Sequence, residues 1–478
     1  MIIDGISYRE FAEKVRSESK YEIILPFVEL MERKLGAKVI FDLQNIPFGR
    51  YDLADPLQIA YRFKKEGILE WFGYVDPLPD EPPFRLWKGS QGKEAGKQVG
   101  GGSLTDDRAA IFAVLGEALE RYLWRTQQDY FVKPVHTTSA EIARKGAFID
   151  PRRFSGFSNE QRGGNPEWKL NEDSSFLWIQ GVSLITSKKT YVPAQTASAA
   201  ISPRHEREPT IRMQTTVGLA TWPTLAEARL KGALEVIERD AYMIMWLNQL
   251  TLPRIALAPL RSEHPAIDML LKRCEQYRLK VHAIRMLTDA PTHAICVVLE
   301  DESWHAPRFA FGLKAHRSLP RAIEGAALEA LRARRSYRKH FQNGGTWDPN
   351  TPVEKIGHRE RTYYWGHGDN AKRLEFLIAG KEEEISAEWE NDTSEQHLQR
   401  VIEWCTASNY ECVSVSLGTS KKNPTPWSVE MVVMPDLQAA YLWEWMRHLG
   451  GERLKSVPEK FGYTPRSEPY IDAPHPYC

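Results

Sequence analysis

The chain has 478 residues, and its 63 Lys and Arg balance its 63 Asp and Glu, so the formal net charge is zero. This balance argues against a protein that binds nucleic acid or an acidic membrane surface through bulk charge, because both need a net positive field. With 42% hydrophobic and 26% charged residues, the composition is typical of a globular chain that buries a large core. Length alone allows about three domains of ~150 residues or one large α/β body.

The cysteines and the apolar segments exclude two further classes. Five scattered cysteines without a C-x-x-C pair indicate neither a disulfide framework nor a zinc knuckle, and they favour a reducing cytoplasm. No window approaches ~18 uninterrupted apolar residues, so we expect no membrane-spanning segment. The N-terminus shows no secretory signal pattern.

The first 84 residues are predicted to form a small α/β appendage. Helical periodicity over residues 8–35 meets Gly36, and a strand-like run follows at 37–41. A proline-rich stretch at 76–83 then marks a boundary, because proline lacks the donor that helices and sheets need. We therefore divide the chain into an appendage, 1–84, and one domain, 85–478.

The rest of the chain mixes the two element types. The glycine- and lysine-rich segment 89–102 is predicted to be a loop, and it lacks the spacing of a Walker A phosphate loop. Near the C-terminus, the patterns predict a helix at 397–407, strands at 411–417 and 428–434, and a helix at 437–449. Alternating helices and strands favour a layered α/β or α+β body.

A short repeat places carboxylates in pairs on predicted helices. It is E-x-x-E-R, at residues 115–121 (LGEALER) and 233–239 (ALEVIER), with a related helix at 326–334 (AALEALRAR). Positions i and i+3 share a helix face, which pairs Glu117 with Glu120 and Glu235 with Glu238. Buried paired carboxylates repel each other and need arginines or divalent cations to neutralise them. Oxygen-only ligands suit Mg²⁺, to which Glu329 on the third helix can add one more carboxylate.

A second interpretation of the repeat stays open. A single E-x-x-E-R is usually a solvated helix face with local ion pairs, and for one copy we favour that interpretation. With two copies and a third glutamate helix, we give metal binding the same weight as a solvated helix face. The arginines after each pair, Arg121 and Arg239, have the planar fork that matches phosphate oxygens. The spacing does not show that the three helices converge.

The chain resembles the YcaO-domain family over about residues 90 to 478. The blocks that carry the resemblance are 116–122 (GEALERY), 216–228 (TVGLATWPTLAEA) with its continuation to 241, and 311–312 (FG) with 326–330 (AALEA). The resemblance implies an α/β (α+β) YcaO fold, with glutamate-bearing helices packed on mixed or antiparallel sheets. It also implies that ATP and Mg²⁺ bind without a Walker loop.

The resemblance assigns site residues by position. The implied metal set is Glu117, Glu120, Glu235, Glu238 and Glu329. The implied nucleotide-binding set is Glu227, Arg239, Arg121, Glu120 and Glu238.

The C-terminus, 473–478 (APHPYC), has alternating prolines. Alternating prolines favour a stiff polyproline II segment, although such an end is more often a frayed terminus. It resembles the Pro-x-Pro-x-Pro tail of azoline-forming members, whose terminal carboxylate reaches the active site. Pro474 and Pro476 match, and Cys478 stands at the third proline. Its carboxylate is the candidate acid, base or orienting group.

The family implies an ATP-dependent cyclodehydratase subunit. Such a subunit phosphorylates a backbone amide oxygen of a ribosomally made precursor peptide and forms thiazolines or oxazolines from Cys, Ser or Thr, as in microcin biosynthesis. One alternative is thioamide or macroamidine formation from the same activated amide, for which a neighbouring TfuA-like gene is a marker. The other alternative is a non-catalytic nucleotide-binding scaffold.

The resemblance also implies partners. The chain has no room for a fused leader-binding domain of several hundred residues. We therefore expect a separate E1-like leader-binding partner, the precursor peptide and a flavin-dependent azoline dehydrogenase, with a homodimer inside a hetero-oligomer. The alternative is a standalone enzyme. No nucleic-acid or membrane partner is expected.

Overall fold

A computed structural model divides the chain into two compact units, and each is described by itself. The first comprises Met1–Pro79, Pro83–Leu123 and Ser420–Trp427, and the second comprises Asp80–Pro82, Trp124–Thr419 and Ser428–Cys478. The structure describes residues 2–3, 6–7, 17, 55–92, 98–126, 134–199, 208–303, 307–342, 348, 350–366, 368–386, 388–418, 423–467 and 470–477. The helix and strand predicted for 8–35 and 37–41 lie outside these residues, except for Ser17, which is helical.

The first unit contains an antiparallel three-stranded sheet in the order β3-β4-β5. Its elements are β1 (Ile2–Ile3), β2 (Ile6–Ser7), α3 (Pro56–Lys65), β3 (Trp71–Tyr74), β4 (Arg85–Ser90), β5 (Gln98–Ser103) and most of α4 (Asp107–Thr126). Residue 84, where the appendage is predicted to end, lies between β3 and β4 of this sheet. That boundary stays a prediction.

The loop predicted for 89–102 is wrong at both ends, because β4 extends to Ser90 and β5 begins at Gln98. Two of its glycines, Gly89 and Gly101, lie in these strands and serve close packing instead. A Cβ on Gly101 would lie 2.0 Å from the carbonyl oxygen of Ala110 in α4. Glycine therefore lets the helix approach the strand more closely than any side chain allows.

The second unit contains two sheets, which confirms the predicted mixture of helices and strands. One has the order β10-β17-β16-β8-β9-β7, with β6 paired to β8, and the other has the order β14-β13-β12-β11-β15. All strand pairs are antiparallel except β7 with β9 and β11 with β15. The strands of the first sheet are β6 (Val135–Thr138), β7 (Ala147–Phe148), β8 (Ser175–Ser183), β9 (Lys189–Pro193), β10 (Leu219–Trp222), β16 (Val413–Ser416) and β17 (Ser428–Val433). Those of the second are β11 (Arg254–Ile255), β12 (Leu279–Arg285), β13 (His293–Asp301), β14 (Phe309–His316) and β15 (Glu382–Glu383).

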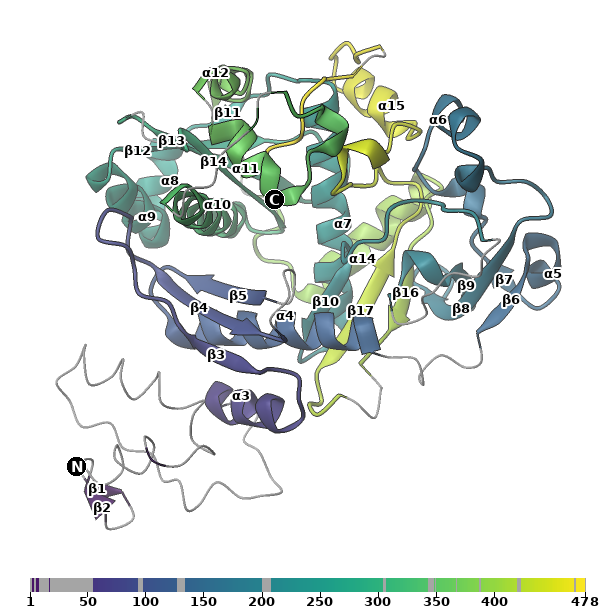
Figure 1. The fold of residues 1–478 in the computed structure, drawn as a ribbon, viewed down its shortest axis with the longest axis horizontal. Coiled ribbons are helices and arrows are strands. Elements are labelled where there is room, and N and C mark those ends of the chain that lie inside the picture. Colours follow the sequence, from purple (N-terminus) through teal and green to yellow (C-terminus); the bar gives the residue numbers. More distant parts are fainter. Residues whose placement is uncertain are drawn as a thin grey trace. The chain divides into compact units, whose positions relative to one another are not determined.

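Two long helices of this unit organise the packing (Figure 1). The helix α7 (Leu225–Leu247) contacts strands of both sheets, and α10 (Leu319–Gln342) packs on β13 and β14. The other helices are α5 (Ser139–Ala143), α6 (Asn159–Gly164), α8 (Leu257–Glu263), α9 (Pro265–Gln276), α11 (His358–Gly366), α12 (Gly368–Lys372), α13 (Glu375–Ile378), α14 (Ser394–Ala407) and α15 (Arg453–Lys460). The last two turns of α7, Ala241–Leu247, are apolar on every side and contribute a continuous run of buried residues to the core.

The close packing of β14 against α10 allows a prediction about stability. A Cβ on Gly312 would lie 2.0 Å from the carbonyl oxygen of Ala326 and 2.5 Å from the amide nitrogen of Ala330. Since backbone atoms cannot swing away, we expect Gly312→Ala to lower the free energy of unfolding by about 3 kcal/mol. The control is Gly163→Ala in α6, where a Cβ meets nothing within 4 Å. It should be neutral or stabilise by up to about 1 kcal/mol. Urea unfolding measures both, and equal effects would contradict the prediction.

Three of the four elements predicted near the C-terminus are confirmed, as α14, β16 and β17. The helix predicted at 437–449 is wrong, because only a short 3-10 turn forms, at Glu444–Met446. The carbonyl of Leu442 accepts from the guanidinium of Arg361, 2.6 Å away, instead of from a helical amide. A long-range contact therefore replaces the local hydrogen bonds that the pattern predicted.

Two negative findings hold for the part of the chain that the structure describes. Within the described residues, no helix is long and apolar enough to cross a bilayer. The cysteines in that part form no disulfide, and all are buried: Cys274, Cys296, Cys405 and Cys412.

Candidate functional site

Three strand–helix pairs hold a glutamate in the same way. In each, a main-chain amide at or beside the strand donates to Oε2 of a glutamate on the following helix. The pairs are Gly100–Glu117 at 2.8 Å, Gly218–Glu235 at 3.1 Å and Leu313–Glu329 at 2.7 Å. The residues of each pair are 17, 17 and 16 positions apart in sequence. The structure thus contains a repeated strand–helix unit. In the sequence, only its helical half forms a repeat.

The glutamates of the second unit converge on one arginine. Glu238 follows Glu235 by one helical turn, and its Oε2 accepts from the amide of Ala315, at 2.8 Å. A guanidinium nitrogen of Arg239 lies 3.6 Å from Oε1 of Glu235 and 3.4 Å from Oε1 of Glu238. The main chain orients both carboxylates, and the arginine bridges the oxygens that remain.

Burial sets the electrostatics of this cluster. It raises the pKa of Glu235 and Glu238, and the charge of Glu329 raises both further, while Arg239 opposes the shift. Burial alone would lower the pKa of Arg239, but the acidic groups around it, Tyr477 and the three glutamates, raise it well above its ordinary value. The cluster therefore holds three carboxyl groups against one guanidinium, and a further cation would favour their charged forms.

The third glutamate is bound by the C-terminal segment. The hydroxyl of Tyr477 donates to Oε1 of Glu329 at 2.6 Å, and its ring lies 4.2 Å from the guanidinium carbon of Arg239. Burial raises the pKa of Tyr477 well above its ordinary value, so the hydroxyl keeps its proton and acts as a donor. Tyr477 thus contacts both the acidic and the basic member of the cluster.

The remaining predicted residues lie apart from this cluster or in the other unit. Glu117, Glu120 and Arg121 are on α4 in the first unit, where Arg121 pairs with Glu117 at 2.5 Å. Glu227 is at the start of α7, 3.8 Å from Arg317, and it accepts from the hydroxyl of Ser394. The structure therefore brings Glu235, Glu238, Glu329 and Arg239 together. Convergence of all three helices stays a prediction.

The donor set fits Mg²⁺. Every ligand is a carboxylate oxygen, the type that Mg²⁺ prefers. In each glutamate Oε2 is fixed by a main-chain amide, whereas Oε1 faces a side chain, Arg239 or Tyr477, that can be exchanged. No three His, Cys, Asp or Glu side chains among the described residues are placed as for a bound ion. A metal ion bound to Oε1 would replace these contacts with Arg239 or Tyr477.

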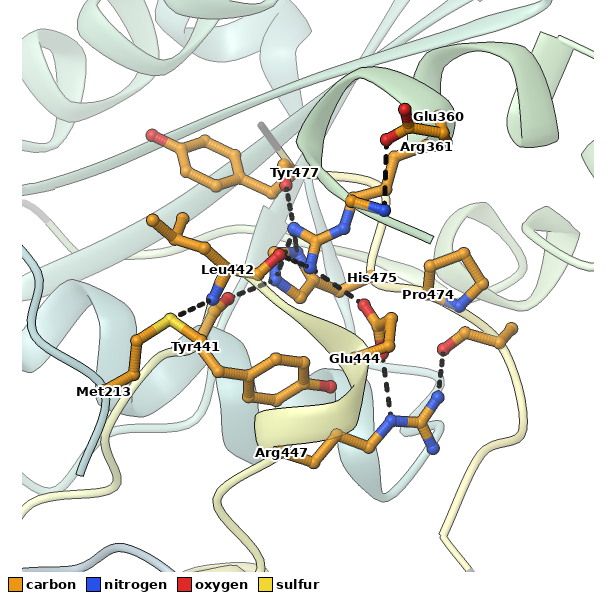
Figure 2. A network of polar contacts seen from close by, with 12 residues as sticks. Met213, Glu360, Arg361, Tyr441, Leu442, Glu444, Arg447, Pro474, His475 and Tyr477 are labelled. Atoms are coloured by element: carbon orange, nitrogen blue, oxygen red, sulfur yellow. Dashed lines mark hydrogen bonds and ion pairs between the residues drawn. The ribbon is translucent and has the colours of Figure 1, made fainter. Parts of the chain in front are cut away.

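The C-terminal segment docks through a buried network (Figure 2). The guanidinium of Arg361 binds Nε2 of His475 at 2.7 Å, the carbonyl of Tyr477 at 3.3 Å and the carboxylate of Glu444 at 2.8 Å. His475 also contacts the carbonyl oxygen of Tyr441 at 2.7 Å. These contacts hold the segment against the protein up to its penultimate residue.

Both tail prolines lie within this docked segment. The carbonyl of Pro474 accepts from the indole of Trp365 at 3.1 Å, and that of Pro476 accepts from the hydroxyl of Tyr337 at 3.3 Å. Cys478 lies outside the described residues, so the role of its carboxylate stays a prediction.

Sequence reasoning missed two residues of this arrangement. The sequence signal for Tyr477 is its position alone, directly before the last residue of a proline-rich end. Arg361 carries no local signal, because its partners are distant in sequence: Glu444 is 83 residues away and His475 is 114.

Comparisons with known proteins bear on this arrangement. A family model described as YcaO cyclodehydratase, ATP- and Mg²⁺-binding, matches residues 100–438. A curated relative from Rhizobium leguminosarum bv. trifolii, an uncharacterized protein in the tfuA 3' region, is 25% identical over 199 residues. That match covers 41% of this chain and 43% of the relative, so the chain spans less than half of the relative's length.

Solved structures share the fold. A heterocyclase in complex with substrate and cofactor has a TM-score of 0.71 and 19% identity, over 88% of this chain and 57% of its own. YcaO from Methanopyrus kandleri, bound with AMPPCP and Mg²⁺, has a TM-score of 0.58 and 16% identity, over 83% and 96%. The E. coli microcin synthetase McbBCD complex has a TM-score of 0.52 and 14% identity, over 77% and 88%.

The fold predicted from the resemblance is thus confirmed, and ATP and Mg²⁺ are the ligands named for the matching family. Since the family model covers most of the chain, from the glycine-rich β5 to the segment after β17, the chain belongs to the YcaO family of ATP- and Mg²⁺-binding cyclodehydratases.

Proposed function

We propose that this chain is the ATP-dependent cyclodehydratase subunit that forms thiazolines or oxazolines in a ribosomally made precursor peptide. One observation carries the proposal: the docked C-terminal segment contacts the buried glutamate cluster directly, through Tyr477 and Glu329. A carboxylate cluster for metal and phosphate beside the docked C-terminal segment combines groups that this chemistry needs.

The reaction must turn a poor leaving group into a good one. The side-chain sulfur or oxygen of Cys, Ser or Thr adds to the preceding amide carbonyl carbon and loses its proton. The former carbonyl oxygen takes the γ-phosphoryl group of ATP, and ADP departs. The nitrogen lone pair then forms a C=N bond, the C–O bond breaks, phosphate leaves, and the nitrogen loses its proton. The peptide has lost one water overall, and ATP has become ADP and phosphate.

The chain's residues receive roles within this proposal. Mg²⁺ supplies charge neutralisation for the phosphates when it is bound. The residues proposed to hold it are Glu117, Glu120, Glu235, Glu238 and Glu329. Those proposed for the nucleotide are Glu227, Arg239, Arg121, Glu120 and Glu238. Pro474 and Pro476 would stiffen the tail and so position the carboxylate of Cys478 to orient the amide or to move its proton.

The position of that carboxylate can be tested by one added residue. A glycine appended after Cys478 moves the carboxylate by up to about 3.5 Å. We expect a loss of about 100-fold in product formation, because displacement of an acting group by about an ångström has that effect. Cys478→Ala keeps the carboxylate in place and should retain activity. Mass spectrometry of the peptide measures both, and an active extended protein would rule out this role.

Partner proteins are part of the proposal. We propose that a separate E1-like protein binds the leader of the precursor peptide, that a flavin-dependent dehydrogenase can follow, and that the subunit acts as a homodimer within the complex. One structural neighbour, an E. coli microcin synthetase complex with pro-MccB17 bound, supports partner and peptide binding. Residues 1–84 are proposed as an appendage, and the reduced cysteines support a cytoplasmic location.

A second function is favoured by one specific observation. The curated relative lies in the region downstream of tfuA, and a TfuA-like neighbour is the marker for thioamide formation. In that reaction a sulfur nucleophile displaces phosphate from the same activated amide, so one sulfur replaces one oxygen.

Mass spectrometry separates the two functions. The protein, its gene-neighbour partners, precursor peptide and ATP are mixed, and the peptide mass is recorded. Loss of one water for each modified Cys, Ser or Thr supports the cyclodehydratase. Exchange of one oxygen for sulfur supports thioamidation. ATP turnover with an unchanged peptide contradicts both.

A further inference from the structure

A small, partly open recess lies beside the glutamate cluster in the second unit. Its walls come from the segment before β10, from α7 and from the segment after β17. The lining includes two arginines, Arg212 and Arg239, and apolar side chains such as Val236 and Leu437. A small recess with an apolar lining and a few convergent charged groups is the usual form of a small-ligand site.

The two arginines differ in their partners. Arg239 is matched by the carboxylates of Glu235 and Glu238. Arg212 forms no hydrogen bond or ion pair with any described residue, and its guanidinium carbon lies 5.1 Å from the centre of the Phe154 ring. Burial without a compensating charge lowers its pKa to about 10, so it remains a cation at neutral pH.

The nearest titratable neighbour does not compensate this charge. Burial and the charge of Arg212 lower the pKa of His448 to about 3, which keeps it neutral. Its Nε2 accepts from the amide of Met213 at 3.0 Å, which agrees with an unprotonated nitrogen. A partly buried cation without a counter-ion is unfavourable, and a bound anion would reduce that cost.

We propose that this recess is an oxyanion site that holds inorganic phosphate through Arg212 and Arg239. This inference rests on the proposed function, in which phosphate leaves the peptide, and it assigns that phosphate a place. A planar guanidinium fork matches phosphate oxygens, and tetrahedral phosphate has enough acceptors for two forks. A carboxylate has the same oxyanion chemistry but only two oxygens. Arg239 joins the recess to the glutamate cluster, so phosphate held there stays beside the proposed metal site.

The test measures binding without nucleotide or peptide. Inorganic phosphate, and acetate in a separate series, are titrated into the full-length protein and followed by calorimetry, with ³¹P line broadening for the phosphate series. The variants are Arg212→Gln and Arg212→Lys. The control is Arg162→Gln, because Arg162 is a half-buried arginine outside the recess whose pKa is also lowered by burial. Thermal unfolding of each variant checks that it is folded.

We expect phosphate to bind the wild type and Arg162→Gln equally, and Arg212→Gln about ten- to a hundredfold more weakly. Arg212→Lys should bind phosphate with an affinity between those of the wild type and Arg212→Gln, because lysine keeps the charge but lacks the planar guanidinium fork. Absent phosphate binding, or equal binding by Arg212→Gln, overturns the proposal. Arg212-dependent binding of acetate in preference to phosphate also overturns it, in favour of a peptide carboxylate. The binding assay contains no peptide, so it is independent of the mass-spectrometry experiment. If phosphate binds as expected but the peptide mass does not change, the proposed function is rejected and the phosphate site is not.

Discussion

Glu235→Gln lowers ATP-dependent peptide modification by at least about 100-fold, while the protein stays folded. The amide side chain still accepts from Gly218, so the local geometry persists. What is lost is a negative charge beside Glu238 and Glu329, which the account assigns to Mg²⁺ and phosphate binding. Removing one group that stabilises developing charge in a buried site commonly costs 100- to 1000-fold in rate. Stability should not fall, because burial already disfavours the charged form of Glu235.

The measurement is product formation in the complete complex, with Mg²⁺–nucleotide binding as a second readout. The matched control is Glu263→Gln, which makes the same chemical change at an exposed position of α8. The control should modify the peptide at the wild-type rate. If Glu235→Gln also does so, the chain is a nucleotide-binding scaffold and not the catalyst.

Arg361→Met destabilises the protein by about 3–5 kcal/mol and undocks the C-terminal segment. Arg361 is fully buried and binds the carboxylate of Glu444, the ring of His475 and the carbonyl of Leu442. Removing it leaves Glu444 with Arg447 as its remaining ion-pair partner among the described residues, and breaking a buried ion pair in this way typically costs this much. Urea unfolding measures the change. The control is Arg400→Met, whose side chain is half exposed, and it should cost less than about 1 kcal/mol.

The loss of stability in Arg361→Met should also depend on pH. Burial raises the pKa of Glu444 in the folded protein, and Arg361 opposes that shift. Without Arg361, the folded-state pKa rises further above the unfolded value, so the charged form penalises folding at neutral pH. Lowering the pH protonates Glu444 and narrows the difference between variant and wild type. A difference that widens on acidification would contradict this explanation.

The local half of the site could be predicted from the sequence. Periodicity depends on neighbours along the chain, and it correctly placed the glutamates of α4, α7 and α10 on helices. It also predicted that paired carboxylates need a cationic partner, which Arg239 provides in the second unit.

The long-range half could not be predicted. The amide that orients Glu238 belongs to Ala315, 77 residues later, and no periodic pattern records such a pair. The helix predicted for the segment after β17 is wrong for the same reason. Its pattern is helical, yet the carbonyl of Leu437 accepts from the hydroxyl of Ser155, 282 residues away in sequence, instead of from a helical amide. The docking of the tail was implied by family resemblance, since a short proline-rich end by itself indicates a frayed terminus.

The central claim is that the glutamates on the strand–helix units bind the metal of an ATP complex. The most direct test is a crystal structure with a non-hydrolysable ATP analogue and Mn²⁺, located by its anomalous signal. The account predicts Mn²⁺ at about 2.0–2.2 Å from carboxylate oxygens of Glu235, Glu238 or Glu329, with Tyr477 displaced from Glu329 if that residue is a ligand. The same map shows whether Glu117 and Glu120 join them. A nucleotide bound with its metal away from all five glutamates would contradict the claim.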